Sequence, residues 1–250
     1  GRLFELDLDC LSERHDVRST DVLGQTMTVR LELPQGGWRY FDGHVCRFEY
    51  LGVTPTRHFA HYRLVLRPWL WFLTRSADCR IFQDRTVPEI LTEVFREHGF
   101  SDFQAALYGE YRRWEYCVQY RESDFDFVSR LMEQEGIYYY FKHGMGKHTL
   151  VLADSYSAHG AVPGYDKIPY YPPDTHDRRL RDHIDRWALS QEVQPGTYVH
   201  NDFNFIRPKA SLEAKASKPQ GHSHAENEIY DYPGEYSESG DGQTYARIRM

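Results

Sequence analysis

The sequence contains one tight cluster of potential metal ligands, His222 and His224 followed by Glu226 and Glu228. Alternate residues of a strand face the same side, so two imidazoles at this spacing could point together, as a zinc site requires. A zinc site also needs third and fourth ligands with hydrogen-bonded support, which the sequence does not indicate. Thirteen histidines in 250 residues bring such neighbours together by chance. We therefore predict no metal site and no cofactor.

Two pairs of carboxylates could perform acid–base chemistry, Asp124 with Asp126 and Glu133 with Glu135. Glycoside hydrolysis uses two carboxyl groups that flank the scissile bond. However, the aspartates fall in the first turn of a predicted helix, where they complement the helix dipole, and the glutamates fall on its predicted exposed face. Their positions are explained without catalysis.

A third group mixes acidic and basic residues between 177 and 186, and mixed-sign runs of this kind typically form solvated surfaces. The sequence lacks the motifs of a nucleophile elbow, a phosphate-binding loop and a zinc protease helix. It therefore predicts no enzyme. A cell-wall hydrolase that uses the Asp and Glu residues of the loops at 155–186 stays open as the alternative.

Composition narrows the class of protein further. The formal net charge is −7, which gives no electrostatic reason to expect nucleic-acid binding. No apolar run approaches the roughly 18 residues that cross a bilayer, so we expect no stable membrane insertion. Aromatic residues make up 15% of the chain and favour strands, which predicts a mainly β architecture with a few helices.

The four cysteines lie far apart and form no Cys-x-x-Cys pair. Each occurs inside an apolar or alternating stretch, where a thiol typically serves as a small core side chain. We therefore expect Cys10, Cys46, Cys79 and Cys117 to be reduced thiols with a structural role.

The first 75 residues read as a series of strands with meander spacing, which suggests a small barrel or sandwich. In residues 3–10, apolar and acidic residues alternate, so that Phe4, Leu6 and Leu8 share one face. Asp42-Gly43 reads as a tight turn between two of the strands. The predicted strands cover residues 3–10, 25–33, 38–41, 44–51, 59–66 and 70–73.

Two helices are predicted from caps and apolar stripes. Thr86 and Glu89 form a Thr-x-x-Glu capping box that begins a helix at about 87–98. Ser123 caps a second helix that ends at Gly136, with Asp126 at its third position and Leu131 in its buried stripe.

The rest of the chain alternates between β patterns and polar stretches. Residues 155–180 read as a long surface loop, and residues 213–228 as a polar linker. We expect further strands at 114–120, 137–141, 149–152, 187–193 and 198–205, and a strand that starts at the end of the chain, near Met250.

Five motifs occur in an order that resembles VgrG, the spike protein family of bacterial type VI secretion systems. The resemblance covers nearly the whole chain. The motifs are Arg80-Ile-Phe-Gln83, Val87–Leu91, Tyr116–Asp124, Phe127–Tyr140 and Tyr230–Gly234.

The resemblance implies the hub fold of contractile phage tail baseplates, with two related β-barrel-like domains. It divides the chain into a first barrel at 1–104 with a helical extension at 84–100, an inserted second barrel-like domain at 105–180, a return to the first barrel at 181–212, and a linker with the start of a following domain at 213–250. The residues that carry the family signature, with structural roles only, are Ile81, Phe82, Gln83, Pro88, Tyr116, Ser123, Asp124, Gly136, Tyr138, Tyr230, Asp231, Tyr232, Pro233 and Gly234.

The resemblance also implies a function. It predicts a non-enzymatic homotrimeric hub that docks on the hexameric Hcp tube, joins baseplate components, and carries a PAAR tip protein and effectors through segments after Met250. Such a protein is assembled in the bacterial cytoplasm and then secreted through the type VI apparatus into target cells or the medium. A phage or pyocin tail baseplate hub is the alternative in the same mechanical class.

Overall fold

The computed structural model of the chain is mainly β with a few short helices, as predicted. It describes residues 1–33, 36–55, 58–172, 182–219 and 221–250. The chain forms two compact units, of which the larger holds most of the residues before 167 and the smaller holds most of those after 182. The expected domain boundary between 180 and 181 lies outside the described residues.

The first sheet of the larger unit has four antiparallel strands in the order β1-β4-β3-β2. Its core consists of the buried side chains Val45, Leu64 and Leu66. Leu6 and Leu8 pack against this core from alternate positions of one strand, which confirms the predicted alternation. The bounds are Leu6–Ser12 for β1, Thr26–Glu32 for β2, Trp38–Val53 for β3 and Ala60–Arg67 for β4, with a short helix α1 at Ser19–Val22.

Strand β3 is continuous, so the prediction of two strands joined by a turn at Asp42-Gly43 is wrong. Both residues are paired in register with β2. Aspartate and glycine are depleted in strands, which is why the pattern indicated a turn. Here Asp42 is fully buried, and a Cβ on Gly43 would lie only 3.1 Å from the Arg67 carbonyl oxygen. The glycine therefore permits a close approach of β4.

The strand predicted at 70–73 is also wrong, because Trp69–Arg75 forms a 3₁₀ helix, η1. Trp69, Leu70 and Leu73 are buried in it, and this i, i+1, i+4 spacing suits one face of a helix. Pro68 precedes the helix and accepts a hydrogen bond from the Trp71 backbone N–H. The aromatic content favours strands, but the burial of the helical face decides the local structure.

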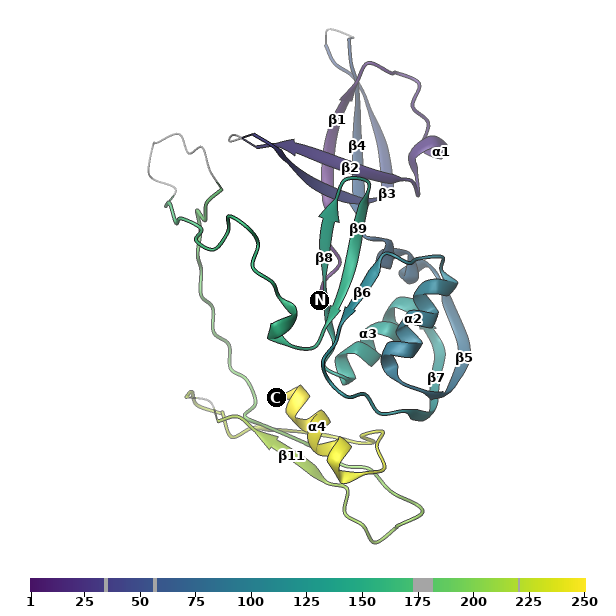
Figure 1. Cartoon of the computed structure of the whole chain (residues 1–250), viewed down its shortest axis with the longest axis vertical. Coiled ribbons are helices and arrows are strands. Elements are labelled where there is room, and N and C mark those ends of the chain that lie inside the picture. Colours follow the sequence, from purple (N-terminus) through teal and green to yellow (C-terminus); the bar gives the residue numbers. More distant parts are fainter. Residues whose placement is uncertain (34–35, 56–57, 173–181, 220) are drawn as a thin grey trace. The chain divides into compact units, whose positions relative to one another are not determined.

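Two more sheets complete the larger unit. Strands β5 (Ala77–Arg85) and β7 (Trp114–Ser123) pair antiparallel, and Figure 1 shows them curving around helices α2 and α3. The other sheet has the order β6-β9-β8 and contains the predicted hairpin at 137–152. The sequence analysis missed β5 and β6. The remaining bounds are Phe103–Ala106 for β6, Tyr138–Gly144 for β8, Lys147–Ala153 for β9 and Tyr156–Ala158 for the 3₁₀ helix η2.

The two predicted helices are confirmed, as α2 (Val87–Glu97) and α3 (Asp124–Gln134). The capping box of α2 is complete: Glu89 N–H donates to Thr86 Oγ1, and Thr86 N–H donates to the Glu89 carboxylate. For α3, Asp126 N–H donates to Ser123 Oγ at 3.0 Å. These bonds satisfy backbone donors that a helix start leaves without partners.

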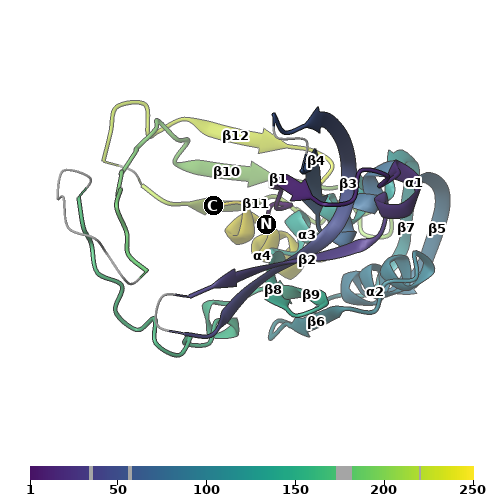
Figure 2. The ribbon, with the colours of Figure 1, turned by 90° about the horizontal axis from the view of Figure 1, so that it is seen from above.

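The smaller unit contains a three-stranded sheet in the order β11-β10-β12 and a helix, α4, that packs against β10 and β11 (Figure 2). Strand β12 is parallel to β10, while β11 is antiparallel to it. Tyr198, Ala214 and Ala246 form the core between sheet and helix. The bounds are Thr197–His200 for β10, Ala214–Ser217 for β11, Glu228–Asp231 for β12 and Ser239–Arg249 for α4.

Several predictions for this region are wrong. Residues 187–193 form no strand, and Trp187 and Leu189 are exposed by 69% and 87%. The strand predicted at 198–205 ends at His200, and the presumed linker at 213–228 contains β11. The chain ends in α4 and not in a strand. Glycines and polar residues hide this helix in the sequence, because its packing and not its propensity stabilises it.

The cysteines differ in burial more than predicted. Cys117 is buried, and Cys10 and Cys46 are half-buried, which suits core thiols. Burial raises the pKa of the Cys46 thiol to about 11, so this thiol is unreactive at neutral pH. Cys79 is exposed on β5, so its expected core position is wrong. No helix in the described part of the chain has the length and apolar character needed to cross a membrane.

The helix phase of α3 is testable at Leu131, which is fully buried. Leu131→Ala removes buried methyl groups and leaves a cavity, so we expect a loss of about 2–5 kcal/mol in the free energy of unfolding. Urea unfolding followed by circular dichroism measures it. Glu133→Ala on the exposed side of the same helix is the control and should change stability by less than about 0.5 kcal/mol. Equal effects of the two substitutions would contradict the packing described.

Candidate functional site

A buried carboxylate lies where β7 meets α3. Asp124 is the first residue of the helix, and only 6% of its side chain is exposed. Its Oδ1 accepts hydrogen bonds from Gln119 Nε2 at 2.7 Å and from the Arg80 guanidinium at 3.3 Å. Its Oδ2 accepts one from Ser76 Oγ at 2.6 Å and lies 2.7 Å from His98 Nε2. Residues before β5, within β5 and β7, and after α2 thus meet at one carboxylate.

Burial and these hydrogen-bond partners shift the pKa of Asp124 in opposite directions. Burial is the largest influence and by itself raises the pKa. The three side-chain hydrogen bonds and the positive charge of Arg80 together outweigh burial, so the pKa lies below its usual value. The carboxylate therefore stays charged and holds its donors across the neutral and mildly acidic range.

Serine, histidine and aspartate meet at this site, but their arrangement is not that of a nucleophilic triad. In a triad the serine and the aspartate bind different nitrogens of the imidazole. Here Ser76 Oγ and Asp124 Oδ2 both lie beside His98 Nε2, at 3.4 and 2.7 Å, and the Ser76 hydroxyl donates to the carboxylate. The hydroxyl is thus engaged by the acid and not activated by a base. The cluster connects elements and activates no nucleophile.

A second buried pair, Asp42 and His148, joins the first sheet to the β8–β9 hairpin. Asp42 Oδ1 lies 2.7 Å from His148 Nδ1, and both side chains are almost completely buried. The Trp69 backbone N–H donates to His148 Nε2 at 2.9 Å. Asp42 Oδ2 accepts from Thr28 Oγ1 at 2.7 Å, and its backbone N–H donates to His143 Nδ1 at 3.1 Å.

This geometry fixes the protonation of His148. Because Nε2 accepts the Trp69 N–H, it carries no proton, so the neutral ring donates from Nδ1 to Asp42. Burial is the main cause that lowers the pKa of His148, and it outweighs the opposing effect of Asp42. Both ring nitrogens are occupied within the protein, and neither can exchange a proton with a substrate.

The Tyr230–Gly234 motif organises the smaller unit. The hydroxyl of Tyr198 donates to Asp231 Oδ2 at 3.0 Å and so links β10 to β12. The Gly234 N–H donates to the Asn201 carbonyl at 2.9 Å. The peptide bond between Tyr232 and Pro233 is cis, and both side chains are exposed.

Tyr236, just after this motif, is the central side chain of the unit. Its hydroxyl donates to the carbonyls of Leu212 at 2.7 Å and His200 at 3.2 Å, and burial raises its pKa to about 12. A Cβ on Gly234 or Gly242 would lie 2.2 or 2.4 Å from the Tyr236 ring. Glycine is therefore required at both positions for the ring to fit between them.

The other signature residues divide into core and surface. Phe82 is buried and stacks on Phe127 at a centroid distance of 5.4 Å. Pro88 lies in the first turn of α2, Gly136 adopts a positive φ after α3, and Tyr138 donates to the Ser155 carbonyl. In contrast, three of them are exposed: Ile81, Gln83 and Tyr116. The structure does not bring the signature residues together in one cleft.

The residues considered for metal or acid chemistry do not converge either. The ring of His222 accepts the Gln194 N–H and contacts the Ser223 carbonyl, and His224 is exposed. The described part of the chain contains no group of three His, Cys, Asp or Glu side chains able to hold a metal. Most of the mixed-sign run at 177–186 lies outside the described residues, and Asp182 pairs with Arg39.

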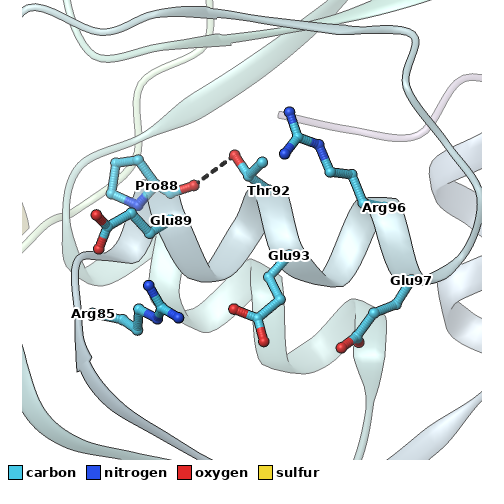
Figure 3. A pocket seen from close by; sticks show the side chains of 7 residues that line it. All are labelled: Arg85, Pro88, Glu89, Thr92, Glu93, Arg96 and Glu97. Atoms are coloured by element: carbon cyan, nitrogen blue, oxygen red, sulfur yellow. Dashed lines mark hydrogen bonds between the residues drawn. The ribbon is translucent and has the colours of Figure 1, made fainter.

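An open groove of about 700 Å³ runs along α2 (Figure 3). Its side chains come from one helix face and from Arg85 at the end of β5, and they carry charges of both signs. Thr92 donates to the Pro88 carbonyl and thus faces its own helix. This mixture of charges is typical of a solvated helix face. The lining residues are Arg85, Pro88, Glu89, Thr92, Glu93, Arg96 and Glu97.

In the described residues, the buried polar side chains hold strands, helices and loops together. The chain belongs to the phage tail baseplate hub (GPD) family, whose model matches residues 1–250. The order of motifs, read from the sequence as a tail-hub signature, is thereby confirmed.

The chain is similar along its whole length to spike proteins of Pseudomonas aeruginosa. It is 52% identical to the type VI secretion system spike protein VgrG1a, covering 100% of this chain and 38% of that protein. Identity to VgrG2a is 32%, over 99% of this chain and 29% of that protein. The chain thus spans about a third of the length of the curated relatives it matches.

Solved structures agree on the fold. The E. coli c3393 protein, described as a type VI secretion component with similarity to the T4 bacteriophage tail proteins gp27 and gp5, has a TM-score of 0.59 at 29% identity, covering 69% of this chain and 46% of that chain. A tail protein of Neisseria meningitidis has a TM-score of 0.58 at 12% identity, over 98% of this chain and 66% of that chain. The second likeness concerns the fold alone.

Asp124→Asn tests the first buried site. The substitution removes the charge that Arg80 faces, so we expect a loss of about 3–5 kcal/mol in the free energy of unfolding. Urea unfolding at pH 7 measures it. Because the lowered pKa makes the contribution of Asp124 present at neutral pH and lost in acid, the difference from the parent protein should shrink as pH falls below about 4. The control Asp126→Asn, at an exposed first-turn carboxylate, should cost less than about 1 kcal/mol.

His148 gives a second prediction, on pH. Its pKa is lower in the folded than in the unfolded chain, so its stabilising contribution is complete above about pH 6.5 and is lost as pH falls below that value. Thermal unfolding between pH 8 and pH 5 should show this loss. His148→Gln should reduce the slope, while His143, whose pKa burial also lowers, keeps part of it. The control His224→Gln should keep the full slope, and an unchanged slope in His148→Gln would refute the assignment.

Proposed function

We propose that this chain is the structural hub at the base of a type VI secretion spike. The observation that carries the proposal is the identity of 50–52% over the whole chain with three spike proteins of this system. Phage tail proteins of the same fold share only 12–13% identity with it. This contrast favours a secretion spike over the alternative of a phage or pyocin baseplate hub.

As a hub, the chain supplies shape and stiffness to the spike. The free energy that drives the spike comes from the contraction of the sheath. Three copies form a ring that docks on the Hcp tube hexamer and contacts baseplate components. Three chains can match a six-subunit tube if each presents two comparable barrel-like lobes. The division into 1–104 with 181–212, an inserted domain at 105–180, and 213–250 leading to the next domain stays a prediction, although β10 pairs with β11 and β12 within the smaller unit.

Cargo is carried elsewhere in the complete spike. A PAAR tip protein and effectors attach through segments that follow Met250, and the assembled spike leaves the cytoplasm through the type VI apparatus. The signature residues act in this proposal as structural positions, and Asp124 and the Tyr230–Gly234 motif support it by the hydrogen bonds they make. The alternative of a cell-wall hydrolase that uses the Asp and Glu residues of the loops at 155–186 stays a prediction, because residues 173–181 of this segment lie outside the described residues.

The oligomeric part of the proposal predicts a monomer–trimer equilibrium or a stable trimer. Analytical ultracentrifugation from low to high protein concentration, at low and moderate salt, measures it. The contacts between copies of this chain must by themselves offset the entropy lost on association. We therefore expect the fraction of trimer to rise with protein concentration. A monomer at every concentration would remove the ring from the proposal, and a stable two-fold dimer would contradict the hub itself.

A genetic experiment separates the functional alternatives. Deletion of the gene should abolish release of the Hcp tube protein into the medium and leave phage or pyocin production unchanged, and complementation should restore release. The reverse pattern would favour a phage-type hub. Release of soluble peptidoglycan fragments by the purified chain would favour the hydrolase.

A further inference from the structure

The outward side of the β5–β7 sheet carries several exposed apolar side chains. Tyr116, Val118 and Tyr120 are exposed by 53%, 37% and 63%, and Ile81 on the paired strand by 53%. Ile81 pairs directly with Val118, so the four side chains are neighbours on one face. Cys79, paired with Tyr120, is exposed at its edge. We call these five residues the outer face.

The inward side of the same strands carries polar groups beside the buried Phe82 and Cys117. Arg80 and Gln119 point to Asp124 on that side and are hydrogen-bonded to it. An antiparallel sheet normally places apolar residues inward and polar residues toward solvent. The outer face of β5–β7 departs from this rule, because it exposes large apolar side chains to water.

A second apolar surface lies on the loop that joins β10 to β11. Phe203, Phe205 and Ile206 are exposed by 58%, 80% and 77%. We call these three residues the apolar loop. Arg207, which pairs with Glu238, and Lys209 follow them and are exposed.

The backbone of the apolar loop is fixed from within. Asn204 is buried, and its Oδ1 accepts the N–H groups of Ile206 and Arg207, both at 2.9 Å. Its Nδ2 donates to the Ser237 carbonyl at 3.1 Å. Asp202 accepts the N–H groups of Phe203 and Tyr236. A loop that is held in one conformation with its apolar side chains outward loses little entropy when it binds.

Neither surface alone is large enough for a stable interface. From the exposed fractions, each offers about 450 Å² of side-chain area, given the area that side chains of these sizes carry. A standard interface buries about 1,600 Å², of which about 900–1,000 Å² is apolar. The two surfaces together supply about this apolar area.

In a ring of identical subunits, each copy contacts its two neighbours through two different surfaces. The outer face lies on a sheet and the apolar loop on a connection between two strands, and the two belong to different units of the chain. A contact of either surface with its own kind would bury a two-fold interface and would end at a dimer. The pair thus fits a second copy of this chain in a ring.

We propose that the apolar loop of one copy packs on the β5–β7 outer face of the next copy and that this contact closes the ring. The inference rests on the proposed function, which requires a ring, and adds the surfaces that form it. Phe205 and Ile206 would lie against Tyr116 and Tyr120, with the basic residues of the loop at the rim.

Cross-linking between two populations of the 250-residue chain tests the contact. One population carries Phe203→Cys together with Cys79→Ser, and the other keeps Cys79 and the natural loop. The two are mixed at a concentration where ultracentrifugation shows trimer and are treated with a short bis-maleimide. Because each population contributes one partner, a link between positions 203 and 79 joins two different copies. Mass spectrometry identifies the linked peptides.

We expect a 203–79 link at least about tenfold more abundant than with the control Tyr156→Cys, which is exposed by 90% and lies outside both surfaces. A trimer without this link would overturn the assignment of surfaces and leave the proposed hub function intact. A dominant 79–79 link within the second population would also overturn it, because it reports two like faces in contact. A monomer at all concentrations would overturn both the contact and the ring.

Substitution gives an independent readout that does not rely on cross-linking. Phe205→Ser and Tyr120→Lys should each raise the concentration for half-trimerisation at least about tenfold, as expected for central apolar residues of an interface. Both side chains are exposed, so the fold should persist, and circular dichroism verifies this. The control Tyr156→Lys should leave the trimer unchanged. Unchanged trimerisation of the two variants would refute the contact.

Discussion

The buried carboxylate of Asp124 is the constraint on which much of the larger unit depends. A charge taken out of water must be matched by donors, or it costs several kcal/mol. The side chains that bind its two oxygens come from positions 76, 80, 98 and 119. Hydrogen bonding to this one carboxylate therefore fixes the positions of four separate segments. The apolar residues of α2 and α3 drive burial, but the carboxylate decides which single arrangement of strands and helices meets its needs.

Asp42 and His148 repeat this principle between the first sheet and the β8–β9 hairpin. The pair is 106 residues apart in sequence and is completed by the Trp69 backbone N–H. A hydrogen-bonded pair in a dry interior resists sliding, since any displacement leaves a buried donor or acceptor unpaired. Apolar contacts tolerate small shifts more easily. The pair therefore holds the first sheet and the β8–β9 hairpin in one arrangement.

Local patterns in the sequence were sufficient wherever the deciding contacts lie within a few residues. The capping bonds of Thr86 and Ser123 and the buried position of Leu131 were predicted from spacing alone. The role of Asp124 was not: the sequence placed it in a first helical turn, which is correct, but only as a partner of the helix dipole. Its network was invisible because the partners are up to 48 residues away. The only local signal was a polar residue, Gln119, at an inward position of an alternating strand.

The other wrong predictions also arise because a local sequence pattern does not show contacts between distant residues. Helix α4 is held by Tyr236, which packs against Gly242, and by the His200 side chain, which lies 2.7 Å from the Gly242 carbonyl oxygen. No helical propensity in Ser239–Arg249 reveals this. The strand predicted at 187–193 rested on apolar alternation, yet these side chains are exposed.

The sequence pattern thus predicts core positions for some apolar side chains that are in fact exposed. In β5 and β7, Arg80 and Gln119 bind Asp124 on the inward side beside the buried Phe82 and Cys117, whereas Ile81, Tyr116 and Tyr120 face water. Water makes such a face costly for an isolated copy, at about 25 cal/mol per Å² of apolar area. The buried polar side chains of the described residues have hydrogen-bond partners, so the side chains that can still gain contacts are the apolar ones on the surface.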